Sequence, residues 1–127
     1  MKKLFTTLCL TLTLLLGSIG NSESADFQKG LTAAQSGDFA TALREWEPLA
    51  KQGNAGAQYN LGLMYGTGKG VIQDNIYAHM WANISASNGN KNGVKVRDIV
   101  EKRMTPTDIS TAQKLARECV RKKYKGC

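Results

Sequence analysis

The sequence predicts an all-α fold, an α-solenoid of about three antiparallel helix pairs with a C-terminal capping helix. Two similar stretches, residues 37–42 and 73–78, begin 36 residues apart (73 − 37), and each is followed by a tryptophan and then by a glycine. These repeated positions are Trp46, Gly53, Trp81 and Gly89. A period in the mid-thirties is the length of one helix-turn-helix unit. Stacked units of this kind present a surface for binding a partner more readily than a pocket for catalysis.

Residues 1–25 have the features of a cleaved secretory signal peptide. Lys2 and Lys3 precede an apolar run over residues 4–16, and small and polar residues follow. The run is shorter than the roughly 20 residues of a membrane span, so a membrane anchor is the less favoured alternative. Cleavage could follow Gly20, Ser24 or Ala25. We expect an exported protein, periplasmic or secreted, whose mature form has no transmembrane segment.

Caps and helical periodicity predict six helices in residues 26–127. The predicted ranges are 26–36, 38–52, 54–65, 74–88, 90–104 and 106–123. Asp38 is a good N-cap, and Gly53 suits the end of the second helix. Thr105 and Pro106 mark the start of the last helix. The apolar stripe predicted to cap the stack consists of Ile109, Ala112, Leu115, Ala116, Cys119 and Val120.

Gly62 lies in the middle of a predicted helix, where glycine costs roughly 1 kcal/mol. We expect a neighbouring helix to approach so closely there that a side chain would separate the two. The large residues Tyr59, Tyr65 and Trp81 would fill the remaining volume.

Two cysteines, Cys119 and Cys127, remain after the predicted cleavage, and an exported protein can keep them oxidised. A continuous helix over these eight positions (127 − 119) would hold the Cα atoms roughly 12 Å apart, beyond the reach of a disulfide. A disulfide therefore requires the helix to end near Lys123 or Tyr124 and the chain to fold back. The alternatives are two free thiols or, less favoured without a nearby histidine, a metal site.

We predict no catalytic, cofactor-binding or metal site. The single histidine, His79, is expected to be partly exposed on the fourth helix. Glu45 and Glu47, two positions apart on a helix, point in different directions and form no carboxylate pair. The glycine-rich stretch 66–70 follows a helix and lacks the spacing of a phosphate-binding loop, so it is read as an interhelical loop.

Positive charge is concentrated in the C-terminal third. Residues 26–90 contain four Lys and Arg against five Asp and Glu, whereas residues 91–127 contain eleven against four. Such a surface could attract an acidic protein, anionic lipid or another anionic component of the cell envelope, or it could simply be solvated. Nucleic acid is disfavoured by export and by the scarcity of aromatic residues among these cations.

Residues 57–89 carry a more specific pattern. The chain reads A-Q-Y-N-L-G-L-M-Y over residues 57–65 and G-K-G-V-I-Q-D over residues 68–74, followed by Ala78, Trp81 and Gly89. This pattern resembles the Sel1-like repeat, a relative of the tetratricopeptide repeat. The best copy spans about residues 54–89, an earlier copy keeps only its second half, and residues 90–104 resemble the first helix of a third.

The resemblance implies a repeat domain over residues 26–127 that acts as a small exported adaptor for an unidentified protein or peptide. Exposed side chains on the first helix of each pair would contact the partner, with Gln58, Asn60 and Lys95 as candidates. The alternative is a β-lactam-binding or weakly β-lactam-hydrolysing protein, similar to cysteine-rich Sel1-like proteins. Those proteins have a disulfide in each repeat, whereas this chain keeps cysteines only near its C-terminus.

Overall fold

The computed structural model describes residues 24–127, and the predicted signal peptide lies almost wholly outside this part of the chain. Each helix of the described part begins at a short polar N-cap whose side chain accepts from first-turn amides, which satisfies donors that have no partner in the helix. These caps are Asp26, Asp38, Asn54, Asp74, Asn90 and Thr105. The helices are α1 (Phe27–Gln35), α2 (Phe39–Lys51), α3 (Ala55–Thr67), α4 (Asn75–Ser87), α5 (Lys91–Glu101) and α6 (Pro106–Arg121).

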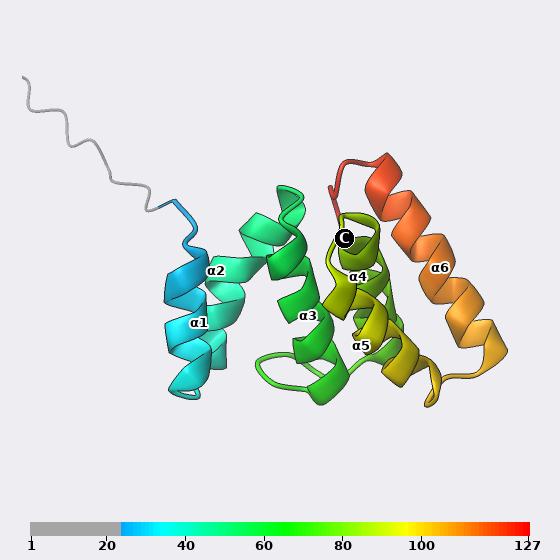
Figure 1. Cartoon of the computed structure of the whole chain (residues 1–127), viewed down its shortest axis with the longest axis horizontal. Helices are drawn as coiled ribbons and strands as arrows, with labels where there is room; N and C mark the ends of the chain where they lie inside the picture. Colours follow the sequence, from blue (N-terminus) through cyan, green and yellow to red (C-terminus); the bar gives the residue numbers. More distant parts are fainter. Residues whose placement is uncertain (1–23) are drawn as a thin grey trace, which may run out of the picture.

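The helices stack side by side from α1 to α5, with α6 lying across the far end (Figure 1). Gly53 and Gly89 make the turns after α2 and α4 with φ values of 92° and 95°, a backbone conformation that suits glycine. All regular elements within residues 24–127 are helical, so the predicted small α-solenoid is confirmed. α4 is the central element, because α3, α5 and α6 all pack against it.

Close helix contacts explain two glycines in helix interiors. A Cβ atom at Gly62 would lie 3.2 Å from the Ala82 amide nitrogen and 3.3 Å from the Ala78 carbonyl oxygen, so the expected close approach of α3 and α4 is present. A Cβ atom at Gly30 would lie 2.3 Å from Trp46 Nε1. The large ring of Trp46 therefore fits only because α1 carries no side chain at that point.

The apolar core lies on two sides of α4. The larger cluster joins α2, α3, α4 and α6 and includes Trp46, Leu61, Trp81 and Cys119. The smaller one lies between α4 and α5 and is formed by Ala78, Ala82, Val96 and Val100. Because α4 contributes to both, it is buried around most of its circumference.

Three details differ from the sequence prediction. α3 runs two residues further than predicted, because Gly66 stays helical and the helix ends only at Gly68, which has a left-handed φ of 71°. α5 ends at Glu101, three residues early, ahead of the extended backbone of Thr105 that Pro106 favours. α6 does not form a close pair with α5, and it packs against α4 instead.

Candidate partner-binding surface

An apolar pocket lies between the second and third helices. On α3, the side chains at positions 60, 63, 64 and 67 follow the i, i+3, i+4, i+7 spacing of one helix face, and this face is turned toward Phe39 and Trp46 of α2. Ala34 of α1 and Lys69 of the following loop complete the lining. The cavity volume is about 310 Å³, at the lower end of the range of roughly 300–1,000 Å³ typical of ligand pockets. Leu63 is 37% exposed at its edge.

One polar group of this lining stands out. The Trp46 indole donates to the Phe27 carbonyl at 3.2 Å, and the Thr67 hydroxyl donates to the Leu63 carbonyl at 2.7 Å. Asn60 is 8% exposed, and its Nδ2 has no hydrogen-bond partner within residues 24–127. Buried donors are almost always paired, so the Asn60 amide requires an explanation.

The loop after α3 closes one side of the pocket. Lys69 Nζ lies 5.4 Å from the centroid of the Phe39 ring, a cation–π contact. A Cβ atom at Gly70 would lie 2.9 Å from Phe39 Cβ and 2.7 Å from the end of Met64, so the loop backbone is pressed against α2 and α3. Gly70 thus allows the loop to pack closely beside the pocket.

Two of the three predicted contact residues are not exposed. Gln58 is completely buried, donating from Nε2 to the Ala50 carbonyl at 3.0 Å and accepting from Asn88 Nδ2 at 2.8 Å. Asn60 is buried as well, although it lines the pocket. The prediction of exposure was wrong for both: Gln58 is enclosed between the end of α2 and the turn after α4, and Asn60 faces α2. Lys95 is exposed on α5, and its role in binding stays a prediction.

His79 is completely buried, and the prediction of a partly exposed histidine was wrong. Its Nε2 lies 2.7 Å from Glu101 Oε1 at the end of α5. The physical reason is the central place of α4, where even a position outside the apolar stripe is covered by a neighbouring helix. The histidine therefore has a structural contact with α5.

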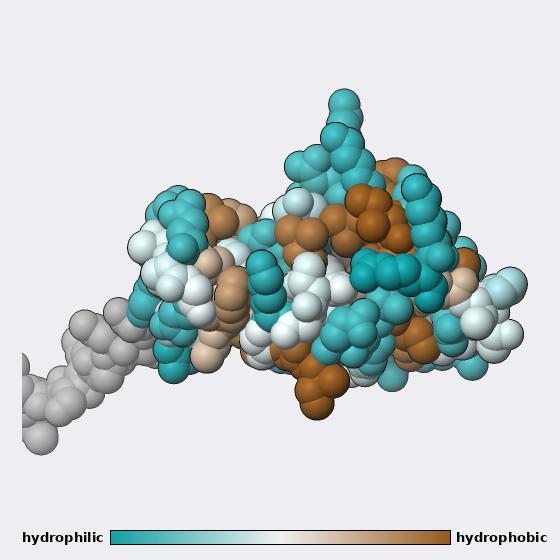
Figure 2. Space-filling view, turned by 90° about the horizontal axis from the view of Figure 1, so that it is seen from below, coloured by the Kyte–Doolittle hydropathy of each residue, from teal (hydrophilic) through white to brown (hydrophobic). Residues whose placement is uncertain are grey.

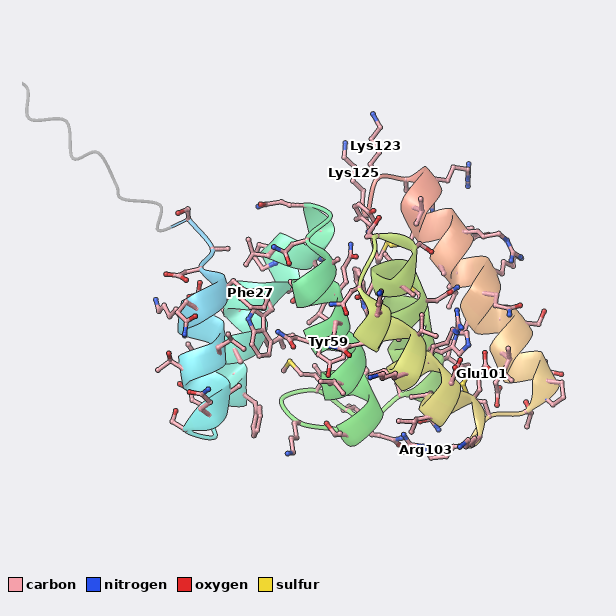
Figure 3. The ribbon with its side chains drawn as sticks, in the orientation of Figure 1. Phe27, Tyr59, Glu101, Arg103, Lys123 and Lys125 are labelled. Carbon is pink, nitrogen blue, oxygen red and sulfur yellow. A yellow bond between two sulfur atoms is a disulfide. The ribbon has the colours of Figure 1, made fainter. Side chains whose placement is uncertain are left out.

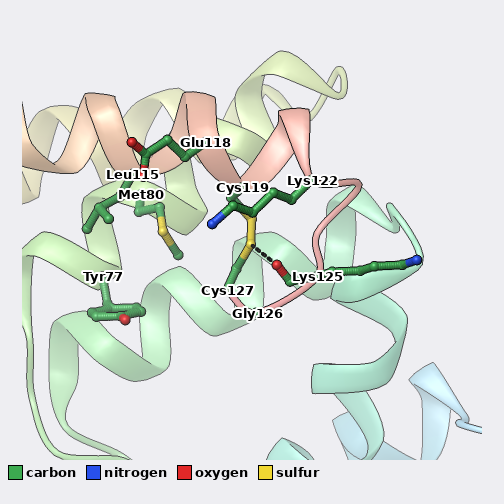
Figure 4. Close-up of a pocket in the computed structure, with 9 residues that line it drawn as sticks. All are labelled: Tyr77, Met80, Leu115, Glu118, Cys119, Lys122, Lys125, Gly126 and Cys127. Atoms are coloured by element: carbon green, nitrogen blue, oxygen red, sulfur yellow. Dashed lines mark hydrogen bonds between the residues drawn. A yellow bond between two sulfur atoms is a disulfide. The ribbon is translucent and has the colours of Figure 1, made fainter.

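Cys119 and Cys127 have their sulfur atoms 2.05 Å apart, at the distance of a disulfide bond, and their Cα atoms 5.7 Å apart (Figure 4). The helix ends at Arg121, and Lys123 and Tyr124 take left-handed φ values of 53° and 64°, which turns the chain back. A small cavity of about 60 Å³ lies beside the sulfurs. Within the described chain, no group of three or more His, Cys, Asp or Glu side chains is placed to hold a metal ion.

The C-terminal cations do not form one patch. Figure 3 places Arg103 at one edge of the C-terminal half and Lys123 and Lys125, on the loop after α6, at the opposite edge. Arg97 is half-buried, 3.4 Å from Asn83 Oδ1 and 3.2 Å from Asp98 Oδ1. Binding of an anionic envelope component therefore stays a prediction. The face shown in Figure 2 likewise carries apolar side chains in separate patches between polar ones.

Two larger hollows, each of about 510 Å³, lie along α1 and α2 and are lined mainly by polar and charged residues. They offer less apolar contact than the pocket between α2 and α3. Among the helices of residues 24–127, none is long and apolar enough to cross a membrane.

Comparison with protein families matches residues 55–90 to the Sel1 repeat. The matched segment comprises α3, the loop that borders the pocket, and α4. Comparison with curated proteins finds no match for this chain.

Proposed function

Because residues 55–90 are a Sel1 repeat, a unit that mediates protein–protein interactions, we propose that this protein is a small adaptor that binds another protein or a peptide. The binding site is the apolar pocket between α2 and α3. We further propose that the adaptor works after export, in the periplasm or outside the cell.

The pocket is the observation that carries this proposal. It combines about 310 Å³ of space with an apolar lining and an accessible edge at Leu63. Binding energy in protein interfaces is concentrated where a large side chain enters such a desolvated pocket. The site lies between the Sel1 repeat and the helix pair that precedes it, so both contribute to its walls.

Export is supported by two features of the chain. Residues 1–25 have the composition of a signal peptide, and Cys119 and Cys127 lie at disulfide distance, which suits an oxidising compartment. Fractionation of cells that make the protein tests this directly. We expect a shortened form outside the cytoplasm, and full-length protein held in the cytoplasm would contradict export.

Site-specific photocrosslinking in intact cells tests the adaptor function. A photoreactive amino acid at position 63, at the pocket edge, is expected to capture a discrete partner that mass spectrometry can identify. The matched control is position 94 on α5, because Leu63 and Val94 are both 37% exposed. Capture of no partner from either position would contradict an adaptor function.

A nitrocefin assay separates this proposal from the β-lactam alternative. The purified protein is expected to give the same rate as a buffer blank. Turnover clearly above the blank would show that binding to a partner is not the whole function.

A further inference from the structure

We propose that the exposed face of α6 is a second docking surface of this adaptor and that it binds an acidic segment of the partner protein. We name this surface the basic face. It is formed by six exposed cations of α6 and the loop that follows it, namely Lys114, Arg117, Arg121, Lys122, Lys123 and Lys125. This inference rests on the proposed function and specifies the chemistry that the partner presents.

The three cations within the helix form a row on the side of α6 that points away from the core. Lys114, Arg117 and Arg121 follow the i, i+3, i+7 spacing of one helix face, and all three are exposed. Neighbouring members are therefore about 5–6 Å apart between Cβ atoms, and the row is about 10 Å long. Because α6 lies across the far end of the stack, a partner can approach this row from outside (Figure 1).

The basic face carries charge of one sign. Within residues 24–127, none of its cations forms an ion pair. The two acidic residues of α6 lie elsewhere, since Asp108 caps the start of the helix and Glu118 is half-buried beside the disulfide cavity. Like charges one helical turn apart repel each other, so the row does not stabilise the free protein. A row of this kind is complementary to a partner of opposite charge.

The stability of the helix accounts for only part of this charge. Cations in the last turn interact favourably with the negative end of the helix macrodipole, and this effect falls off within one turn. Arg121 lies in that turn. Lys114 and Arg117 lie further back in the helix, so the macrodipole does not account for them.

The shape of the basic face favours a narrow partner over a flat anionic membrane. Adsorption to a membrane depends on cations that face one plane, and Figure 3 places Arg103 at the edge opposite Lys123 and Lys125. Helices that lie in a membrane interface also present several large apolar side chains, whereas Val120 is the one exposed large apolar residue within residues 106–121. An acidic segment needs only the row on α6, where each arginine can bind a carboxylate through two parallel hydrogen bonds.

Defined probes test the basic face without knowledge of the partner. We would titrate the ¹⁵N-labelled protein with acetyl-Glu-Glu-Gly-Glu-Glu-Gly-Glu-Glu-amide, with the Gln version of this peptide and with phosphatidylglycerol vesicles. The Glu peptide should bind saturably and shift the backbone amides of Lys114, Arg117 and Arg121. Raising the salt concentration to the physiological value should weaken this binding about tenfold, and the Gln peptide should not bind.

Three outcomes of this titration would overturn the proposal. One is an equal response to the Glu and Gln peptides. Another is a response to the Glu peptide that is spread over all exposed lysines and arginines. The third is binding to the vesicles without binding to the Glu peptide, which would assign the basic face to a membrane surface.

Charge reversal at matched positions separates the basic face from the net charge of the protein. Arg117→Glu combined with Arg121→Glu should weaken binding of the Glu peptide more than about tenfold. The control combines Lys102→Glu with Arg103→Glu, which changes the net charge equally at two exposed positions outside the basic face. It should weaken the peptide by less than about threefold. An equal loss in both variants would mean that only the total charge matters, and the proposal would be wrong.

Neutral substitutions separate binding from a structural role. Lys114→Gln combined with Arg117→Gln removes two cations that lie outside the last turn of α6. This variant should weaken the Glu peptide about tenfold while its melting temperature stays the same or rises, because repulsion within the row is reduced. A lower melting temperature with unchanged affinity would show that these cations serve the fold and not a partner.

Failure of this inference can be told from failure of the adaptor function. If crosslinking at position 63 captures a partner that binds the variant with Arg117→Glu and Arg121→Glu as tightly as the protein without these changes, the adaptor function holds and the basic face is not a docking surface. If the Glu peptide binds as described but no partner is captured in cells, the basic face binds acidic segments and the adaptor function is wrong.

Discussion

Polar side chains in the interior connect consecutive helices. The Ser85 hydroxyl on α4 donates to the Ala55 carbonyl at 2.7 Å, and Gln58 bonds to Ala50 across the α2–α3 turn. Glu45, which is 8% exposed, accepts from the Asp26 amide at 2.9 Å and lies 3.3 Å from Lys29 Nζ. Each of these bonds fixes one helix relative to another, since a buried polar group that loses its partner destabilises the fold.

Glu45 makes the attachment of α1 sensitive to pH. The hydrogen bond from the Asp26 amide is the largest influence on its pKa and holds it below the ordinary value of 4.5, against the opposing effect of burial. Because the pKa is lower in the folded than in the unfolded state, the carboxylate stabilises fully above about pH 4.5, and this contribution disappears as the pH falls through the folded value. Glu45→Gln should therefore be less stable than the protein with Glu45 at neutral pH, and the difference should shrink as the pH falls below about 4.5 and through the lowered pKa of Glu45.

Urea unfolding at several pH values measures this difference. Glu47→Gln is the matched control, because Glu47 forms an exposed i, i+4 ion pair with Lys51 at 2.9 Å and should change stability by less than about 0.5 kcal/mol. A constant difference between Glu45→Gln and the unchanged protein from neutral to acid pH would show that the Glu45 carboxylate does not titrate as described.

Residue-level burial was the part that the sequence predicted least well. Gln58 and His79 are polar, and their partners, Ala50, Asn88 and Glu101, lie eight or more positions away. Local periodicity carries no information about such partners, because it describes one helix at a time. The same reason explains why Asn60 was expected to be exposed. Apart from its polar character, nothing in the sequence indicated that this residue lines a pocket.

At the scale of elements, α5 is held against α4 by a contact that only glycine permits. A Cβ atom at Gly93 would lie 2.7 Å from the Ala82 carbonyl oxygen and 2.8 Å from the Ala86 amide nitrogen. Both are backbone atoms, so the side chain could be accommodated only if the helices moved apart. The sequence predicted this kind of contact for Gly62 within the repeat signature, and Gly93 lies beyond that signature.

Gly93→Ala should destabilise the protein by about 1–3 kcal/mol through overpacking. The matched control is Gly66→Ala in α3, where the added carbon would meet Ala78 and Val100 at the ordinary distances of 3.6 and 3.7 Å. That substitution should stabilise by roughly 0.5–1 kcal/mol, because alanine is the better helix former. Denaturant unfolding measures both, and a stabilising Gly93→Ala would mean that α4 and α5 are not in close contact.

The order and number of helices were predicted well because caps and glycine turns act locally. Asp38, Asn54 and Thr105 begin their helices where the sequence indicated. The apolar stripe of α6 was predicted to cover the end of the stack, whereas the predicted pairing of α6 with α5 was wrong. Leu115, Ala116 and Cys119 of this stripe join the larger core cluster beside α4, and Val120 remains exposed.

Across the whole molecule, the C-terminal loop is fastened to the middle of the stack. Asn88 Nδ2 lies 3.0 Å from the Tyr124 hydroxyl and also donates to Gln58, which in turn donates to Ala50. The Tyr124 ring lies close enough to the turn after α2 that a Cβ atom at Gly53 would be 3.5 Å from it. The Cys119–Cys127 pair holds this loop in its folded-back conformation.

Replacing both cysteines, Cys119→Ala with Cys127→Ala, should lower the free energy of unfolding by about 2–3 kcal/mol. The reason is that the unfolded chain regains freedom in the closed loop and Tyr124 is held less firmly. Unfolding should be measured with and without a reductant. The reductant should lower the stability of the protein with both cysteines to that of the variant and leave the variant unaffected. If the reductant does not change the stability of the protein with both cysteines, the two cysteines form no stabilising disulfide.

The Tyr124 contact also affects how the stack comes apart. In a simple solenoid each unit touches only its neighbours, so the array can open from either end one unit at a time. Here α6 and its loop cannot peel away without also breaking contacts with Gly53 and Asn88, in the turns after α2 and α4. We therefore expect opening from the C-terminal side to break contacts in the middle of the stack as well. We expect α1 to open most easily, so its backbone amides should exchange with solvent fastest among the six described helices.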